Sequence, residues 1–393
     1  MPKYPVNPAV VIAAREELGL DRESAAALLK ISPEYLSELE SGSRQPDLSL
    51  VRRMASKYRV SLAALFMPAP LLPFQKPRDF RTVGGEAPGL SADTLLAIRT
   101  ASELQEIASD LVAEAPDLHE PQELPEPSLS DDASQLAATE RARLSVSVED
   151  QLSWPTASDA FRYWRWRIES LGILVFLIRM PRADCRAFSL WRERALIPTI
   201  VINGVEVDQA KSFSLFHEYA HLLLRRPGMC NERERDVDEA RLERFCNRFA
   251  AHLLMPEQAV REALRLTPPV GRPGDWTIDE LAKVARRLWV SRPALALRLE
   301  EMGLAQSGFY DWVDANLGAE IWSGRIPGGG RLKHHERRLR QFGGEFTSIV
   351  LGALQKGIVD PVGVDEVLGT TSRHLPALES SLEAQRQRYA ALG

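Results

Sequence analysis

The sequence predicts a multidomain, mainly α-helical protein in which one α+β segment holds a small sheet and a helical extension follows it. The chain has 393 residues, 45% of them hydrophobic, which is too long for one small core. Apolar residues recur at helical spacing over most of it, whereas short contiguous apolar runs, typical of buried strands, occur at 172–178 and 199–203. We therefore expect four regions, with boundaries at 1–67, 68–132, 133–310 and 311–393.

Charge, apolar runs and cysteine content exclude several classes of protein. The net charge is −5, from 49 basic and 54 acidic residues, which argues against unspecific coating of nucleic acid but not against a local DNA-reading module. The longest apolar run, 172–178, is far shorter than the roughly 20 residues of a membrane span, and the first 30 residues do not have the pattern of a signal peptide. Three scattered cysteines do not make a disulfide framework. We expect a cytoplasmic protein with no membrane partner.

The first region, 1–67, reads as five short helices. Asp21 and Ser32 have side chains that can accept a hydrogen bond from an orphan backbone N–H, so each is expected to cap a helix, and Pro33 suits a first helical turn. Gly19 and Gly42 supply stops. The helices are expected at about 10–18, 22–30, 33–41, 48–58 and 61–66.

The second region, 68–132, is predicted to be a linker that contains one helix. Pro and Gly are dense from 68 to 88, and 91–114 has a helical pattern. Residues 103–132 hold ten acidic residues and no Lys or Arg. Because like charges repel, we expect the second half of this stretch, from Pro116, to be a solvated, flexible tether.

The third region, 133–310, is expected to combine helices with the two strands. Helices are predicted at 160–171, 212–226, 239–255, 278–288 and 292–302, with Pro256 stopping the third of them. The fourth region, 311–393, is predicted to be a helical extension with a glycine joint at 328–330 that serves partner binding.

The residues that carry chemistry lie inside the predicted helix 212–226, in the run His217-Glu218-Tyr219-Ala220-His221. Residues four apart share one helical face, so both imidazoles can reach a single metal ion. Glu218 then lies beside the metal, where it can act as a general base in a zinc peptidase. The alternative is a chance occurrence in a charged helix. Apolar neighbours predict a buried helix, however, and buried histidines are costly without a strong partner such as a metal.

A catalytic zinc site usually has three protein ligands, so the next helix should supply the third. Glu243 lies 22 residues after His221, which leaves room for a loop and an antiparallel return. Glu239, one helical turn earlier on the same face, is the alternative.

Together these residues resemble the ImmA/IrrE-type metallopeptidase family. The family pattern is HExxH followed by a segment that here reads Glu243-Arg-Phe-Cys-Asn247-Arg-Phe249-Ala-Ala-His-Leu-Leu-Met-Pro256. A strand ending in Asn203 and a Phe213 approach to the motif also match, and the resemblance covers about 160–302. It implies a zincin-like α+β domain with Zn²⁺ held by His217, His221 and Glu243, and with Glu218 as the general base.

The resemblance also implies a protein substrate, a repressor or an antitoxin-like protein, cleaved in transcriptional, stress, toxin–antitoxin or mobile-element regulation. We expect a substrate peptide to lie extended beside strand 199–203 by β-augmentation. His252 is either a plain surface residue or a helper near the substrate. Each cysteine is either a small buried residue or a thiol with a regulatory role, Cys230 and Cys246 by blocking the zinc and Cys185 by oxidation.

Residues 8–66 resemble the XRE (Cro/cI-like) helix-turn-helix family, through Gly19-Leu-Asp-Arg-Glu-Ser-Ala-Ala26 and Tyr35-Leu-Ser-Glu-Leu-Glu40-Ser-Gly42-Ser-Arg44-Gln-Pro46. The third helix would then lie in the DNA major groove. By position in that family, base edges would be met by Ser32, Pro33, Tyr35 and Ser37, and phosphates by Arg22 and Arg44.

The nearly balanced charge of residues 1–67 bears on whether this module binds DNA. Residues 1–67 carry nine Lys or Arg and eight Asp or Glu, so a monomer would bind a duplex weakly. Operator DNA bound by a homodimer, or docking onto a protein instead, are the two alternatives.

Two function classes remain. The first is a zinc endopeptidase fused to its own DNA-reading domain. The second is a non-catalytic transcriptional regulator or antitoxin-like binding protein with a sensory peptidase fold and a structural metal. Glu218 beside three candidate ligands favours catalysis, because a structural site has no use for a general base and closes its fourth position with a protein ligand.

Overall fold

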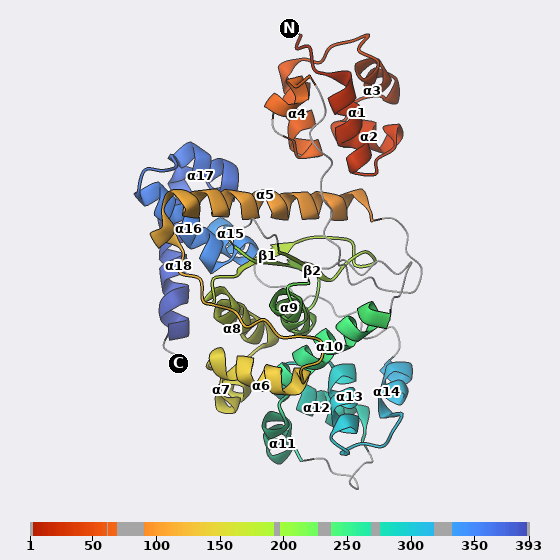
Figure 1. Ribbon diagram of the computed structural model, residues 1–393, viewed down its shortest axis with the longest axis vertical. Helices are drawn as coiled ribbons and strands as arrows, with labels where there is room; N and C mark the ends of the chain where they lie inside the picture. Colours follow the sequence, from red (N-terminus) through yellow and green to blue (C-terminus); the bar gives the residue numbers. More distant parts are fainter. Residues whose placement is uncertain are drawn as a thin grey trace.

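The computed structural model describes residues 3–60, 62–68, 90–191, 197–226, 237–268, 276–317 and 332–390 (Figure 1). The predicted fold class is confirmed, because the described residues are mainly helical and contain one three-stranded sheet. Within those ranges, no helix combines the length and the apolar character that a membrane crossing requires.

The N-terminal region forms the predicted string of short helices, of which the last is a 3₁₀ helix. Asp21, Ser32 and Asp47 cap three of them, each accepting a hydrogen bond from a backbone N–H of the first turn. Lys30 adopts a left-handed conformation, with φ of 53°, at the turn between the second and third helices. The elements are α1 (Pro8–Glu17), α2 (Arg22–Leu29), α3 (Pro33–Glu40), α4 (Leu48–Tyr58) and η1 (Ala63–Phe66).

Helix α5 (Ala92–Glu114) joins this N-terminal domain to the rest of the molecule. On one side, the buried Arg99 donates a hydrogen bond to the Tyr58 carbonyl and forms an ion pair with Glu17. Further along, Gln105 Nε2 donates to the carbonyl oxygens of Leu190 at 3.3 Å and Ile197 at 2.8 Å, beside the sheet. The predicted helix is therefore present, and it is a packed structural element.

The sheet has the strand order β1-β3-β2. Strand β1 (Leu174–Ile178) pairs with β3 (Thr199–Asn203) in parallel, and β2 (Ala187–Leu190) pairs with β3 antiparallel. Strand β3 is thus bonded on both sides, so the expectation that a substrate peptide pairs with residues 199–203 is wrong. The two edge strands are β1 and β2, and β2 was not predicted because four residues give too short a pattern.

Side chains of the strands alternate between two hydrophobic cores. Val175 and Ile200 face one core with α8 (Ala157–Glu169) and α9 (Asp208–Leu223), while Phe176 and Val201 face the other. That second core contains α5, α15 (His334–Phe342) and α16 (Gly344–Gln355), which lie on the opposite face of the sheet from α8 and α9 (Figure 1).

The described residues after 311 are helical, as expected for the C-terminal extension. Two of these helices, α15 and α16, pack against the sheet and so form part of the core. The remaining C-terminal elements are α17 (Pro361–Leu368), η4 (Ser372–His374) and α18 (Leu375–Ala390). The expected glycine joint, 328–330, lies outside the described residues.

Residues 119–132, which we call the acidic strap, differ from the flexible tether that the sequence predicts. After η2 (Pro116–Leu118), the Gln122 N–H donates to the Leu171 carbonyl at 3.1 Å, and Leu124 is buried in the core beneath the sheet. A Cβ atom at Gly172, which has φ of +83°, would lie 2.7 Å from Pro121 Cα, so the strap fits closely against that turn. The Gln122 hydrogen bond and the buried Leu124 side chain thus hold the strap in place despite its charge.

The part of the molecule below the sheet in Figure 1 is helical. Helix α10 (Val237–Leu254) packs against α9 and against α6 (Ala133–Arg143), and it lies between α9 and the helices that follow it (Figure 1). The other elements are α7 (Val148–Ser153), α11 (Glu257–Leu266), α12 (Ile278–Leu288), α13 (Arg292–Glu301) and α14 (Phe309–Leu317).

A buried ion pair within α8, whose two side chains also bond to the C-terminal helices, yields a stability prediction. Arg165 Nε lies 2.8 Å from Glu169 Oε1 with both side chains buried, and Glu169 Oε2 accepts from the Gly344 N–H at 3.0 Å. Glu169→Gln leaves a buried guanidinium without its counter-charge, so the free energy of unfolding in urea should fall by about 3 kcal/mol. Glu257→Gln, which breaks the exposed pair with Arg261, should change it by less than about 0.5 kcal/mol. Equal losses in the two variants would show that the Arg165 pair does not hold these elements together.

Candidate metal centre

Helix α9 brings the two predicted histidines to one buried face. His217 and His221 are each 1% exposed and Glu218 is 2% exposed, so the whole motif is enclosed. The helix is buried because apolar residues flank the motif on both sides, including Phe216, Tyr219 and Leu222, all 0% exposed. Tyr219 Oη donates to Glu140 Oε2 on α6 at 2.5 Å, which fixes the rotation of α9 against its neighbour.

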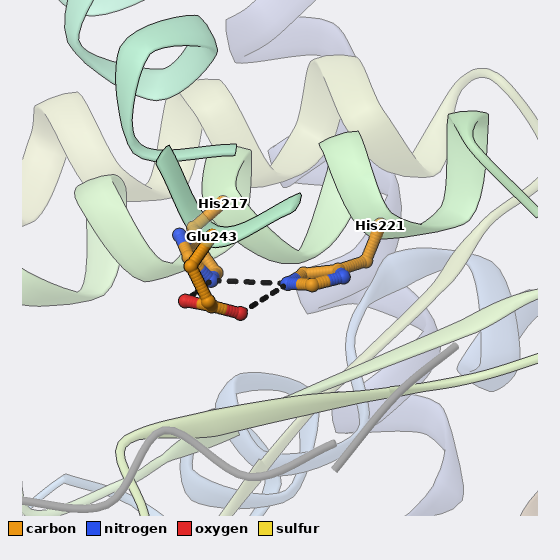
Figure 2. Close-up of side chains that lie close together, drawn as sticks. All are labelled: His217, His221 and Glu243. Atoms are coloured by element: carbon orange, nitrogen blue, oxygen red, sulfur yellow. Dashed lines mark hydrogen bonds and ion pairs between the residues drawn. The ribbon is translucent and has the colours of Figure 1, made fainter. Parts of the chain in front are cut away.

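Glu243 reaches the same point from α10. Its carboxylate oxygens lie 3.4 Å from His217 Nε2 and 3.3 Å from His221 Nε2, and the two Nε2 atoms are 3.1 Å apart. Figure 2 shows the three side chains converging, the histidines from one helix and the glutamate from another. Of the two candidates for a third ligand, the structure thus brings Glu243 to the histidines.

The donor set and its spacing fit a zinc ion. Two imidazole nitrogens and a carboxylate oxygen are common zinc ligands at about 2.0–2.2 Å, and tetrahedral geometry at such bond lengths separates neighbouring ligand atoms by about 3.3 Å. The observed separations of 3.1, 3.3 and 3.4 Å match that value. Among the described residues, these three side chains also lie close enough together to share one metal ion, with ligand atoms all within 4.8 Å of one another.

The far side of each imidazole is held by an oxygen acceptor. His217 Nδ1 lies 3.1 Å from Asn247 Oδ1, and His221 Nδ1 lies 3.3 Å from the Arg226 carbonyl. When each Nδ1 carries the proton, Nε2 presents a lone pair toward the centre, which is the form that binds a metal. Asn247 has no role among the residues expected from the sequence to form the site. Its position four residues after Glu243, on the same face of α10, is the signal that could have identified it.

Electrostatics at the cluster favour a cation. Burial opposes a charged imidazolium, yet the neighbouring Cys246 sulfur and the carboxylates of Glu243 and Glu218 raise the pKa of His221 well above its ordinary value. Burial also raises the pKa of the Cys246 thiol, against the opposing effect of the neighbouring His221. A metal ion would satisfy the same negative environment that attracts this proton.

The other site residues considered from the sequence either lie away from the cluster or fall outside the described residues. His252 contacts Glu301 at 3.3 Å and Arg298 at 3.1 Å on α13. Cys185 is fully buried and its S–H donates to the Ala187 carbonyl, which does not suit the oxidisable thiol considered for a loop. The side chain of Glu239, and Cys230 altogether, lie outside the described residues.

In the N-terminal domain, the residues predicted to meet DNA gather around α3. Ser32, Pro33 and Ser37 are exposed, although Ser32 Oγ also accepts from the Tyr35 N–H. Both predicted phosphate contacts already have carboxylate partners: Arg22 lies 2.8 Å from Glu40, and Arg44 lies 2.9 Å from Glu38. Arg44 also covers the Tyr35 ring at 4.2 Å. The role of these six residues in DNA binding stays a prediction.

Comparisons with known proteins agree with both resemblances found in the sequence. Residues 168–300 match the family described as IrrE N-terminal-like domain, and residues 11–65 match a helix-turn-helix family. The radiation response metalloprotease IrrE of Deinococcus radiodurans is 27% identical over 185 residues, which cover 42% of this chain and 54% of that protein. The match thus spans about half the length of that relative.

The cluster predicts how metal content responds to substitution. His217→Ala, His221→Ala or Glu243→Ala each remove one of three donors, so the purified protein should lose nearly all of its zinc when measured by mass spectrometry. Asn247→Ala keeps the donors but loosens His217, and should weaken zinc binding about 10- to 100-fold in a chelator competition. Glu239→Ala is the matched control on the same helix. Full zinc in Glu243→Ala, with loss in Glu239→Ala, would contradict the ligand assignment.

Proposed function

We propose that this protein is a zinc-dependent, site-specific endopeptidase that acts in regulation. The observation that carries the proposal is the buried cluster of His217, His221 and Glu243 with Glu218 adjacent on α9. The match of residues 168–300 to the IrrE N-terminal-like family supports the same activity.

His217, His221 and Glu243 would hold the zinc ion. When bound, zinc lowers the pKa of water and polarises a peptide carbonyl, which no side chain achieves at neutral pH. Glu218 would accept the proton of the attacking water and pass it to the leaving amine. Its position supports this role, because its charge already acts on the neighbouring His221. Asn247 would keep the His217 ring in the orientation and tautomer that ligation needs.

The substrate peptide would bind in an extended form beside β2. The Arg186 carbonyl oxygen accepts a hydrogen bond from the Asn203 N–H. Because the backbone groups of an antiparallel strand point alternately toward and away from its partner, those of Ala187 and Ser189 point away from β3. An extended peptide could pair with this edge once it is uncovered, because Ala187 and Ser189 are fully buried. Strand β2 also packs against α9, which carries the histidines, so a peptide on this edge would run past the cluster.

The regulatory part of the proposal rests on the N-terminal domain. A helix-turn-helix suggests operator DNA as a partner, and a peptidase domain suggests a protein substrate, for which a repressor or an antitoxin-like protein is our proposal. Both partners would be met in the cytoplasm. Because α3 lies on the side of its domain away from α5 in Figure 1, DNA could be bound while the domain stays docked on α5.

The activity is tested by co-expressing the chain with the products of its neighbouring genes. One of those proteins should shorten with the unaltered chain and stay intact with Glu218→Gln, because the variant lacks the general base yet keeps all three metal donors. The unaltered chain and the Glu218→Gln variant should purify with equal amounts of bound zinc. If every neighbour stays intact with both, or shortens equally with both, the peptidase assignment fails.

A further inference from the structure

A large cavity opens beside the metal centre. It has a volume of about 1260 Å³ and lies between the N-terminal half of α9, the α10 helix and the α12–α14 group. Small-molecule pockets usually measure about 300–1,000 Å³, so a space of this size suits a segment of polypeptide. Asn247, whose side chain contacts His217, lines the cavity, as do Phe213 and Ser214 one turn before that histidine. The cavity therefore adjoins the cluster through Asn247.

Positive charge dominates the lining, although the chain as a whole is negative. Eight arginines and four acidic residues line the cavity among the described residues, whereas the net charge of the protein is −5. The arginines are Arg182, Arg186, Arg241, Arg244, Arg248, Arg286, Arg292 and Arg298. No lysine of the described residues lines it. Arginine is the side chain that binds carboxylates through two parallel hydrogen bonds.

The charge is arranged on two walls. Arg241, Arg244 and Arg248 lie at helical spacing on one face of α10, and all three are exposed. Across the cavity, Arg286 on α12 and Arg292 at the start of α13 line the other wall. Two arginines have acidic partners of their own, since Arg298 lies 2.9 Å from Glu301 and Arg182 lies 3.7 Å from Glu206.

An acidic segment of this chain already borders the cavity. Leu129 and Asp131 of the acidic strap are among the lining residues, and the strap is anchored nearby by the pair of Glu126 with Arg225 at 2.9 Å. One apolar and one acidic side chain thus meet this surface together. Apolar residues also line the cavity, including Val207, Phe213 and Leu297.

We propose that this cavity is a substrate subsite that selects a polypeptide segment of alternating acidic and apolar residues on one side of the scissile bond. The inference rests on the proposed function and deepens it by naming the substrate class. The α10 arginines would bind carboxylates, while the apolar lining would bury the intervening side chains. Lying next to Asn247, the subsite would align the peptide with β2 and the metal centre.

The lining favours a peptide over a nucleic acid strand. A phosphate backbone carries one charge at every residue and would meet Asp131, Glu206, Glu301 and Asp314 as well as the arginines. A peptide can place its carboxylates only where arginines lie. The position of the cavity beside a centre that would cleave peptide bonds also favours a polypeptide occupant.

The test measures binding in the full chain carrying Glu218→Gln, which should not cleave the probe. Fluorescein-labelled octapeptides of alternating Glu and Leu, and of alternating Gln and Leu, are titrated and followed by anisotropy. The Glu peptide should bind on the order of tenfold more tightly or better. Arg244→Glu with Arg248→Glu should abolish that preference. The matched control, Arg337→Glu with Arg373→Glu, makes the same charge change at exposed residues outside the cavity and should preserve it.

The subsite would be overturned if the two peptides bound with equal affinity. It would also be overturned if the preference for the Glu peptide fell equally in the Arg244/Arg248 variant and in the Arg337/Arg373 control. Tighter binding of an oligothymidine than of the Glu peptide, lost in the Arg244 and Arg248 variant only, would assign the cavity to nucleic acid instead. The binding readout does not need catalysis. If the Glu218→Gln protein shows no acidic preference while the unaltered chain still cleaves a neighbouring protein, this inference alone is overturned. If the Glu218→Gln protein keeps the preference but the unaltered chain cleaves nothing, the proposed function alone is overturned.

Discussion

The convergence of His217, His221 and Glu243 within a helix pair is the constraint around which the lower half of the molecule is organised. Two buried imidazoles and a carboxylate lie between α9 and α10, where apolar contacts would otherwise be the stable solution. They can remain there only if α9 and α10 keep a fixed rotation and register. Tyr219 bonded to Glu140 on α6, and Asn247 bonded to His217, each fix one of these helices.

The rest of the fold holds α9 in place from above. The sheet lies on α9, and its other face is covered by α5, α15 and α16, so the metal-centre helix rests on a sheet with cores on both sides. Helices from before and after residues 168–300, the segment that matches the IrrE N-terminal-like family, thus take part in one structure. Because α5 also holds the N-terminal domain through Arg99, a single helix contacts both the helix-turn-helix domain and the sheet that backs the candidate active site.

Sequence predicted the elements whose signals are local. The caps at Asp21 and Ser32, the HExxH spacing and the return to Glu243 depend on residues within one or two helical turns or, for Glu243, on a separation of 22 residues from His221. Features set by distant packing were missed or wrong. Residues 199–203 became the central strand because β2, too short to recognise, pairs with it, and the acidic strap is ordered because Leu124 and Gln122 find partners near α8. The arginines of the cavity are scattered along the chain, so only folding reveals that they share a wall.

The central claim, that one zinc ion is held by two imidazoles and a carboxylate, is tested most directly by zinc X-ray absorption spectroscopy of the purified full-length protein. The account predicts only nitrogen and oxygen neighbours, at about 2.0–2.2 Å. A sulfur neighbour at about 2.3 Å would instead show that a cysteine such as Cys246 closes the site, and the catalytic account would then be contradicted.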